Sequence, residues 1–179
     1  MVLKHKFSKM LPGQSLHSDT FRKMLIKHLR RGYFVTHPKI CIYYPLIINA
    51  KRKCIENFHQ YFFNLPPDND YIKWTVGKAM YMADGTALKQ KQAMDENGFY
   101  SDIISSSAVC TIMCDSINFD EHQRKFTYYG TQLIKRRTRD LKRSMVTTGY
   151  IENVPRTQNN PHGLMITGWR TIENKDLNY

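Results

Sequence analysis

The chain has 179 residues, enough for one domain with its own hydrophobic core. Its formal net charge is +12, but residues 1–53 hold 12 Lys or Arg and a single acid, Asp19, a net of +11. The remaining residues hold 15 basic and 14 acidic side chains, a net of +1, so the composition excludes a uniformly basic protein.

Residues 1–53 lack a consistent hydrophobic period, and we interpret them as a basic arm outside the fold; residues 20–31 could form a short basic helix. No apolar stretch follows the basic start, so no secretory signal is predicted. The most apolar uncharged run, residues 40–50, contains Pro45. At about 1.5 Å per residue it would cover roughly half of a 30 Å hydrocarbon core, so no transmembrane helix is expected.

From residue 56 onward, helical patterns come first. The predicted helices cover residues 56–63, 68–82 and 86–97. The first ends before Pro66, because a residue preceding proline avoids the α region. Asp68 or Asp70 can cap the second helix, and Gly98 can cap the end of the third.

Strand-like alternation follows the helices. The predicted strands cover residues 108–117, 124–137, 141–154 and 164–172. In the last strand, Met165, Thr167 and Trp169 alternate against Leu164 and Ile166. Helices followed by strands predict an α+β fold, with N-terminal helices packed on one face of a curved antiparallel four-stranded sheet.

The last two predicted strands are joined by residues with turn chemistry. Asn160 tolerates left-handed backbone, Pro161 fixes φ, and Gly163 permits positive φ. We therefore expect a well-defined, exposed turn.

The sequence carries no enzymatic signature, and no catalytic, cofactor or metal site is predicted. The four cysteines lack zinc spacing, and they are interpreted as buried apolar residues; Cys110 and Cys114 would share a strand face about 13 Å apart, too far for a disulfide. His59 is interpreted as a packing residue, His122 as part of a polar turn, and His162 as exposed without a catalytic role.

Residues 135–143 contain six basic side chains and Asp140. A solvated sheet edge is favoured over a nucleic-acid patch, since alternation would divide these charges between the two faces.

Six blocks in the span 56–177 resemble the TraK proteins of conjugative transposons of the Bacteroidetes type. The first is residues 58–68, Phe-His-Gln-Tyr-Phe-Phe-Asn-Leu-Pro-Pro-Asp. The others are residues 78–81, 104–108, 143–147, 154–163 and 173–177. Together the blocks extend over about two thirds of the chain, in the family's order.

The resemblance implies an inner-membrane component of a type IV secretion (conjugation) apparatus, with a periplasmic domain of the VirB-eight class and a nuclear-transport-factor-two-like fold over residues 54–179. An Asn-Pro-x-Gly turn is associated with subunit contacts in that class, and Asn160, Pro161 and Gly163 match it. It implies a non-enzymatic scaffold without cofactors, which binds itself and other apparatus proteins.

The family begins with a transmembrane helix, which residues 1–53 do not show. Either this is a divergent or truncated member, or these residues are a non-homologous reading caused by an upstream frameshift. Two other functions remain open: a small-molecule-binding or enzymatic domain of the same fold, which predicts a deep cavity rather than one filled by Tyr128, Trp169 and Met165, and a DNA-binding module.

Overall fold

A computed structural model describes residues 38–177, with side chains described from residue 47. The chain divides into two units, Met1–Leu46 and Ile47–Tyr179. The predicted basic helix at residues 20–31 lies outside the described residues. The elements in order are α3 (Pro38–Phe63), α4 (Asn69–Met80), α5 (Gly85–Glu96), α6 (Phe99–Ser105), β1 (Val109–Asp120), β2 (Lys125–Lys135), β3 (Leu141–Asn153) and β4 (Leu164–Asp176).

Helix α3 begins well before the predicted start at residue 56 and runs unbroken past residue 53. Only its last two turns carry the aromatic pattern that made the helix recognisable. Just upstream, Lys51 lies 2.6 Å from Glu121 in the β1–β2 turn, which fixes this part of the helix against the sheet. Whether residues 1–53 form a separate arm stays a prediction.

The other helices begin and end where capping chemistry predicts. Asp68 caps α4 by accepting a hydrogen bond from the Tyr71 backbone N–H at 2.8 Å. Gly98 follows the end of α5 with a φ of +74°, which confirms its predicted role, and it also precedes α6. The sequence did not predict α6, because its seven residues are too short to show a period.

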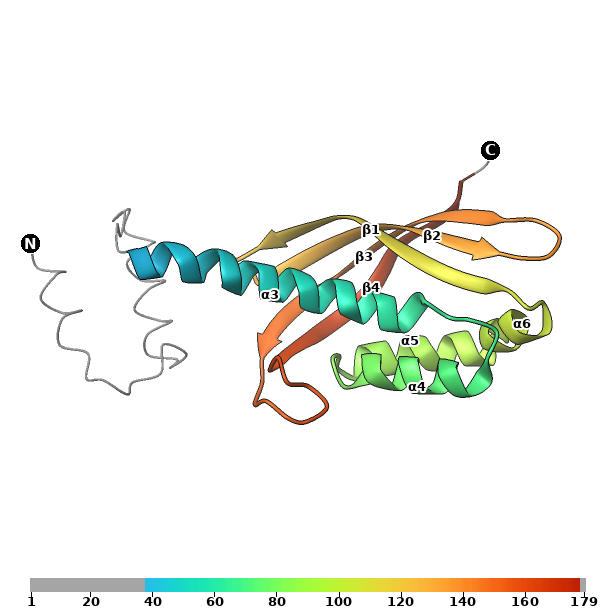
Figure 1. The fold of residues 1–179 in the computed structure, drawn as a ribbon, viewed down its shortest axis with the longest axis horizontal. Coiled ribbons are helices and arrows are strands. Elements are labelled where there is room, and N and C mark those ends of the chain that lie inside the picture. Colours follow the sequence, from blue (N-terminus) through green and yellow to red (C-terminus); the bar gives the residue numbers. More distant parts are fainter. Residues whose placement is uncertain (1–37, 178–179) are drawn as a thin grey trace, which may run out of the picture. The chain divides into compact units, whose positions relative to one another are not determined.

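The four strands form one antiparallel sheet in the order β1-β2-β3-β4, so each strand pairs with its neighbour in sequence. Figure 1 shows the sheet as a curved layer with α3 along one face. Helix α5 contacts β4 on that face. The predicted α+β architecture is therefore confirmed.

Aromatic side chains fill the space between α3 and the concave face of the sheet. Phe58 and Phe62 are fully buried, and their ring centroids lie 5.0 Å and 4.9 Å from that of Trp169 on β4. Tyr128 on β2 is 1 % exposed. Large rings from the helix and the sheet thus occupy the centre of the domain, where aromatic pairs favour edge-to-face contact.

Strand β4 contains a bulge that changes which side chains face this core. Gly168 has a φ of +60°, and the pairing with β3 shifts beside it. The predicted alternation placed Met165 with Trp169, but this was wrong. Leu164, Ile166 and Trp169 are buried together, and Met165 is only half-buried, because the extra residue reverses the order of faces.

The bulge is held by the segment that joins α4 to α5. Asp84 Oδ2 accepts a hydrogen bond from the Gly168 N–H at 3.0 Å, and Thr86 Oγ1 accepts one from the Trp169 N–H at 2.9 Å. Asp84 is also the N-cap of α5, accepting from the Thr86 N–H and hydroxyl. The same segment pairs with β4 through reciprocal backbone hydrogen bonds, from Asp84 N–H to Ile166 O at 2.9 Å and from Ile166 N–H to Met82 O at 2.8 Å.

We expect Asp84→Ala to lower the free energy of unfolding by about 2–3 kcal/mol, because it removes both a helix cap and the acceptor for the bulge. Asp68→Ala is the matched control, since Asp68 is also an N-cap aspartate but only caps; it should cost about 1 kcal/mol. Urea denaturation monitored by Trp fluorescence measures both. Equal losses would show that Asp84 does not stabilise the bulge.

Candidate functional site

The loop between β3 and β4, the predicted contact site, is built around Asn160. Its side-chain Nδ2 donates to Leu164 O at 2.9 Å and to Tyr81 O at 3.3 Å. Its backbone N–H donates to Thr157 Oγ1 at 3.0 Å, and its own carbonyl accepts from the Gly163 N–H at 3.2 Å. Asn160 therefore ties the loop both to itself and to the C-terminal end of α4.

The expectation of an exposed, well-defined turn was only partly correct. Pro161 and His162 are exposed, but Asn160 is 5 % exposed and Gly163 is buried. Gly163 has a φ of +63°, and a Cβ there would lie 2.9 Å from Val154 O, so a larger residue would strain the loop. The three matched residues thus divide into an internal frame, Asn160 and Gly163, and an outer surface that contains Pro161.

His59 lies at the centre of the core and is fully buried. Its ring stacks on Tyr128 with centroids 3.7 Å apart, and Nδ1 donates to Ile55 O at 2.7 Å. This leaves Nε2 as the acceptor for the Thr147 hydroxyl at 2.6 Å. Burial lowers the pKa of His59 to about 3, against a smaller opposing effect of the Ile55 carbonyl. These contacts agree with the predicted packing role of His59. A ring without solvent contact is a poor general base.

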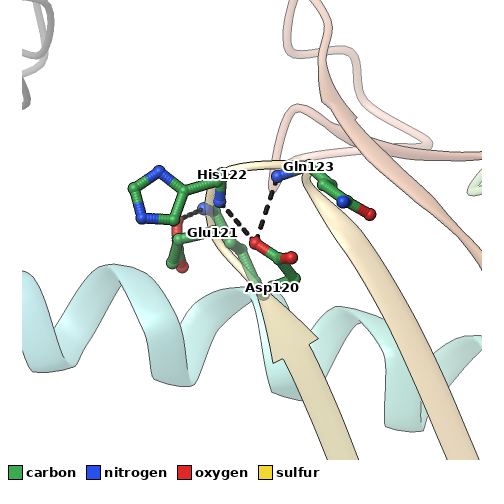
Figure 2. Close-up of polar contacts among 5 residues, drawn as sticks. Asp120, Glu121, His122 and Gln123 are labelled. Atoms are coloured by element: carbon green, nitrogen blue, oxygen red, sulfur yellow. Dashed lines mark hydrogen bonds and ion pairs between the residues drawn. The ribbon is translucent and has the colours of Figure 1, made fainter.

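The polar turn predicted around His122 connects β1 to β2, and Asp120 caps it. Asp120 Oδ1 accepts from the backbone N–H groups of His122 and Gln123 at 2.8 Å and 3.1 Å, and the His122 ring points away from it (Figure 2). These hydrogen bonds lower the pKa of Asp120. An aspartate that accepts backbone donors two and three residues ahead is a common turn device, which explains these residues without catalysis.

The basic residues between β2 and β3 lie mainly in the loop rather than on alternating strand faces. Strand β2 ends at Lys135 and β3 begins at Leu141, so Arg136, Arg137 and Arg139 lie in an exposed connection. The predicted division of charge between two faces was wrong at these positions, because the strand ends two residues earlier than expected. The positive charge is concentrated at one end of the sheet.

Residues 47–177, whose side chains are described, contain three cysteines. No group of three or more His, Cys, Asp or Glu side chains there is arranged to hold a metal ion. Cys54, Cys110 and Cys114 are free thiols, and burial raises the pKa of Cys54 to about 12. Cys54 and Cys110 are buried as predicted, but Cys114 is exposed where β1 reaches its bulge; the side chain of Cys41 is not described.

The fold of the domain is similar to that of three proteins of known structure. The soluble domain of TrwG from the type IV secretion machinery of Bartonella grahamii superposes with a TM-score of 0.59 at 17 % identity, over 73 % of this chain and 96 % of that one. VirB8 from Agrobacterium tumefaciens gives a TM-score of 0.60 at 11 % identity, over 73 % and 94 %. TraE, in complex with 2-(2-furyl)isonicotinic acid, gives 0.60 at 12 % identity, over 71 % and 96 %.

The chain has a VirB8-like fold. No protein-family model and no curated protein sequence matches it. The VirB8-like fold, with helices packed on a four-stranded antiparallel sheet, matches the nuclear-transport-factor-two-like prediction. Among residues 38–177, no helix combines the length and apolar character of a membrane span.

Sequence reasoning missed the residues that hold the β4 bulge of this VirB8-like domain. Asp84 and Gly85 lie between the predicted helices 68–82 and 86–97, and Thr86 begins the second of these. Their contacts with β4 connect residues more than 80 positions apart, for which a single sequence has no local signal. The local signal for the bulge is Gly168, because a glycine inside a strand pattern often marks a bulge.

We expect Asn160→Ala to lower the free energy of unfolding by about 1–3 kcal/mol, because two carbonyls lose their donor inside the protein. His162→Ala, two residues away and exposed, should change it by less than about 0.5 kcal/mol. Thermal or urea denaturation of both variants measures the difference. Equal stabilities would contradict a framework role for Asn160.

The buried His59 predicts a pH dependence of stability. Its folded pKa is depressed, so the unfolded chain binds a proton that the folded chain excludes. Stability from this residue is complete above pH 6.5 and falls by up to about 1.4 kcal/mol per pH unit as the pH drops toward 3. Urea titrations between pH 7 and 5, above most carboxylate titration, measure this slope.

His59→Gln should remove this slope while lowering stability overall, and His122→Gln should leave it unchanged, since His122 is exposed. A slope that persists in His59→Gln would contradict the assignment.

Proposed function

We propose that this chain is a structural subunit of a conjugative type IV secretion apparatus and that it acts through protein–protein contacts. The observation that carries the proposal is the match in fold over 94–96 % of the chains in solved structures of VirB8, TrwG and TraE. The ordered sequence blocks that resemble TraK proteins support the finer assignment to conjugative transposons. The sequence blocks lie within residues 56–177, and the matches in fold cover 71–73 % of this chain.

The β3–β4 loop is the proposed contact. Pro161 and His162 project outward, while Asn160 and Gly163 hold the loop in one conformation. A preformed loop loses little conformational entropy on binding, so its few exposed atoms can contribute effectively. The proposed partners are a second copy of this chain and other components of the apparatus.

The proposed location is the inner membrane, with the domain in the periplasm, and no cofactor is required. A catalytic domain of the same fold is less well supported. Its predicted cavity is occupied by Tyr128 and Trp169, and the buried His59 is already hydrogen bonded on both ring nitrogens. A DNA-binding module would depend on the exposed arginines of the β2–β3 connection.

The proposal predicts that deletion of the gene in a native host abolishes conjugative transfer and that the wild-type gene restores it. His162→Glu should restore transfer at least about tenfold less well, because a new carboxylate would have to be desolvated at a contact. Transfer frequency, with protein abundance measured in parallel, is the readout.

His122→Glu is the matched control, an exposed loop histidine in the β1–β2 turn, and it should restore transfer fully. Unchanged transfer after deletion would overturn the proposed function. Normal transfer with His162→Glu alone would overturn only the assignment of the loop as a contact.

A further inference from the structure

Helix α4 carries an exposed aromatic stripe, which consists of Tyr71, Trp74 and the C-cap residue Tyr81. These side chains are 45 %, 55 % and 52 % exposed, and their spacing of three and seven residues places them on one face of the helix. The opposite face, with Ile72 and Val76, is buried in the domain. Figure 1 shows this helix at the edge of the domain. Exposed Tyr and Trp side chains that share one face are typical of a protein–protein contact.

Contacts along the helix order much of this stripe. The ring centroids of Tyr71 and Trp74 lie 5.6 Å apart, and Lys78 Nζ lies 5.8 Å from the centroid of the Trp74 ring. Side chains that are already ordered lose less conformational entropy when a partner binds. The stripe is therefore prepared for a contact.

Gly77 lies on the same face, three residues after Trp74. A Cβ at this position would meet nothing within 4 Å, so the fold of a single copy does not require a glycine here. Glycine inside a helix is destabilising relative to alanine, and it permits close approach of another backbone or side chain. Its presence is accounted for by a second molecule that approaches α4 closely at this point.

The charges on this face are arranged to meet a second copy of the same helix. Asp70 and Lys78 lie four residues before and four residues after Trp74, in the first and last turns of α4. When two such helices pack antiparallel about a two-fold axis at Trp74, positions equally far from Trp74 come level with each other. Asp70 of each copy then comes level with Lys78 of the other, within reach of the lysine side chain at an interaxial distance of about 8–10 Å. Gly77 comes level with Tyr71 of the second copy and leaves room beside its ring.

We propose that the aromatic stripe is a homodimer contact, in which two α4 helices pack antiparallel about a two-fold axis at Trp74. A parallel pair would instead bring like charges level with each other. The three rings of each copy are about half exposed, so the two copies together can bury roughly 600 Å² of aromatic surface. This lies at the low end of specific interfaces, so the dimer is weak and reversible. The proposal rests on α4 alone and does not depend on the secretion role.

Sedimentation velocity of the full 179-residue chain, between about 1 µM and 1 mM, tests the proposal, and we expect reversible dimerisation. Trp74→Ala should weaken the dimer about a hundredfold or more, because both central rings are lost. Tyr129→Ala is the matched control, since Tyr129 is an aromatic residue of β2 that is 41 % exposed, and this variant should dimerise normally. A chain that stays monomeric at about 1 mM, which would leave the stripe to a different protein, would overturn the proposal. Equal dimerisation of Trp74→Ala and the wild type would also overturn it, because the contact would then lie elsewhere.

Charge reversal tests the antiparallel arrangement. Asp70→Lys and Lys78→Asp should each dimerise roughly tenfold or more weakly alone, because like charges then come level with each other. An equal mixture of the two variants should form a heterodimer about as tightly as the wild type dimerises, because every lysine again meets a carboxylate. A mixture that associates no better than either variant alone would overturn the arrangement.

Gly77→Gln separates association from folding. It should raise the melting temperature, because glutamine is a better helix former than glycine, and it should weaken the dimer, because its side chain occupies the space beside Tyr71 of the second copy. Undiminished dimerisation of this variant would contradict the close approach at Gly77.

Discussion

The fold depends on two backbone N–H groups of β4 that the sheet itself cannot satisfy. Where Gly168 adopts a positive φ, the strand loses its regular pairing, and the freed donors of Gly168 and Trp169 are taken by Asp84 and Thr86. Because these two side chains also begin α5, one short segment fixes a helix and a strand together. Without that contact, Trp169 would not be directed into the aromatic core.

The core itself is specified by a polar residue as much as by apolar ones. His59 has one ring nitrogen that donates and one that accepts, and its ring lies flat on Tyr128, so only one orientation satisfies all three contacts. A phenylalanine could fill the same space in several orientations. The histidine therefore sets the rotation of α3 relative to β2 and β3. Because it is buried for this role, its pKa is lowered and it stays neutral.

Much of the fold could be predicted from local signals. The Asp68 cap, Gly98 and the alternating strands gave the order of elements, because each depends on residues close together in sequence. The start of α3, the short α6 and the faces of β4 could not be predicted, since they depend on distant contacts or on one extra residue in a strand. Within the candidate loop, the sequence predicted a turn but could not show that Asn160 would point inward, because its acceptor at Tyr81 is 79 positions away.

The β3–β4 loop contains buried residues that hold its shape and exposed residues that form its surface. Asn160 and Gly163 determine the path of the loop from inside, whereas the side chains of Pro161 and His162 are exposed. If the loop is the proposed contact, binding specificity and stability depend on different positions. In that case, new side chains at 161 and 162 would change the proposed contact surface while the loop beneath kept its path, so the proposed partner could change without passing through unstable intermediates.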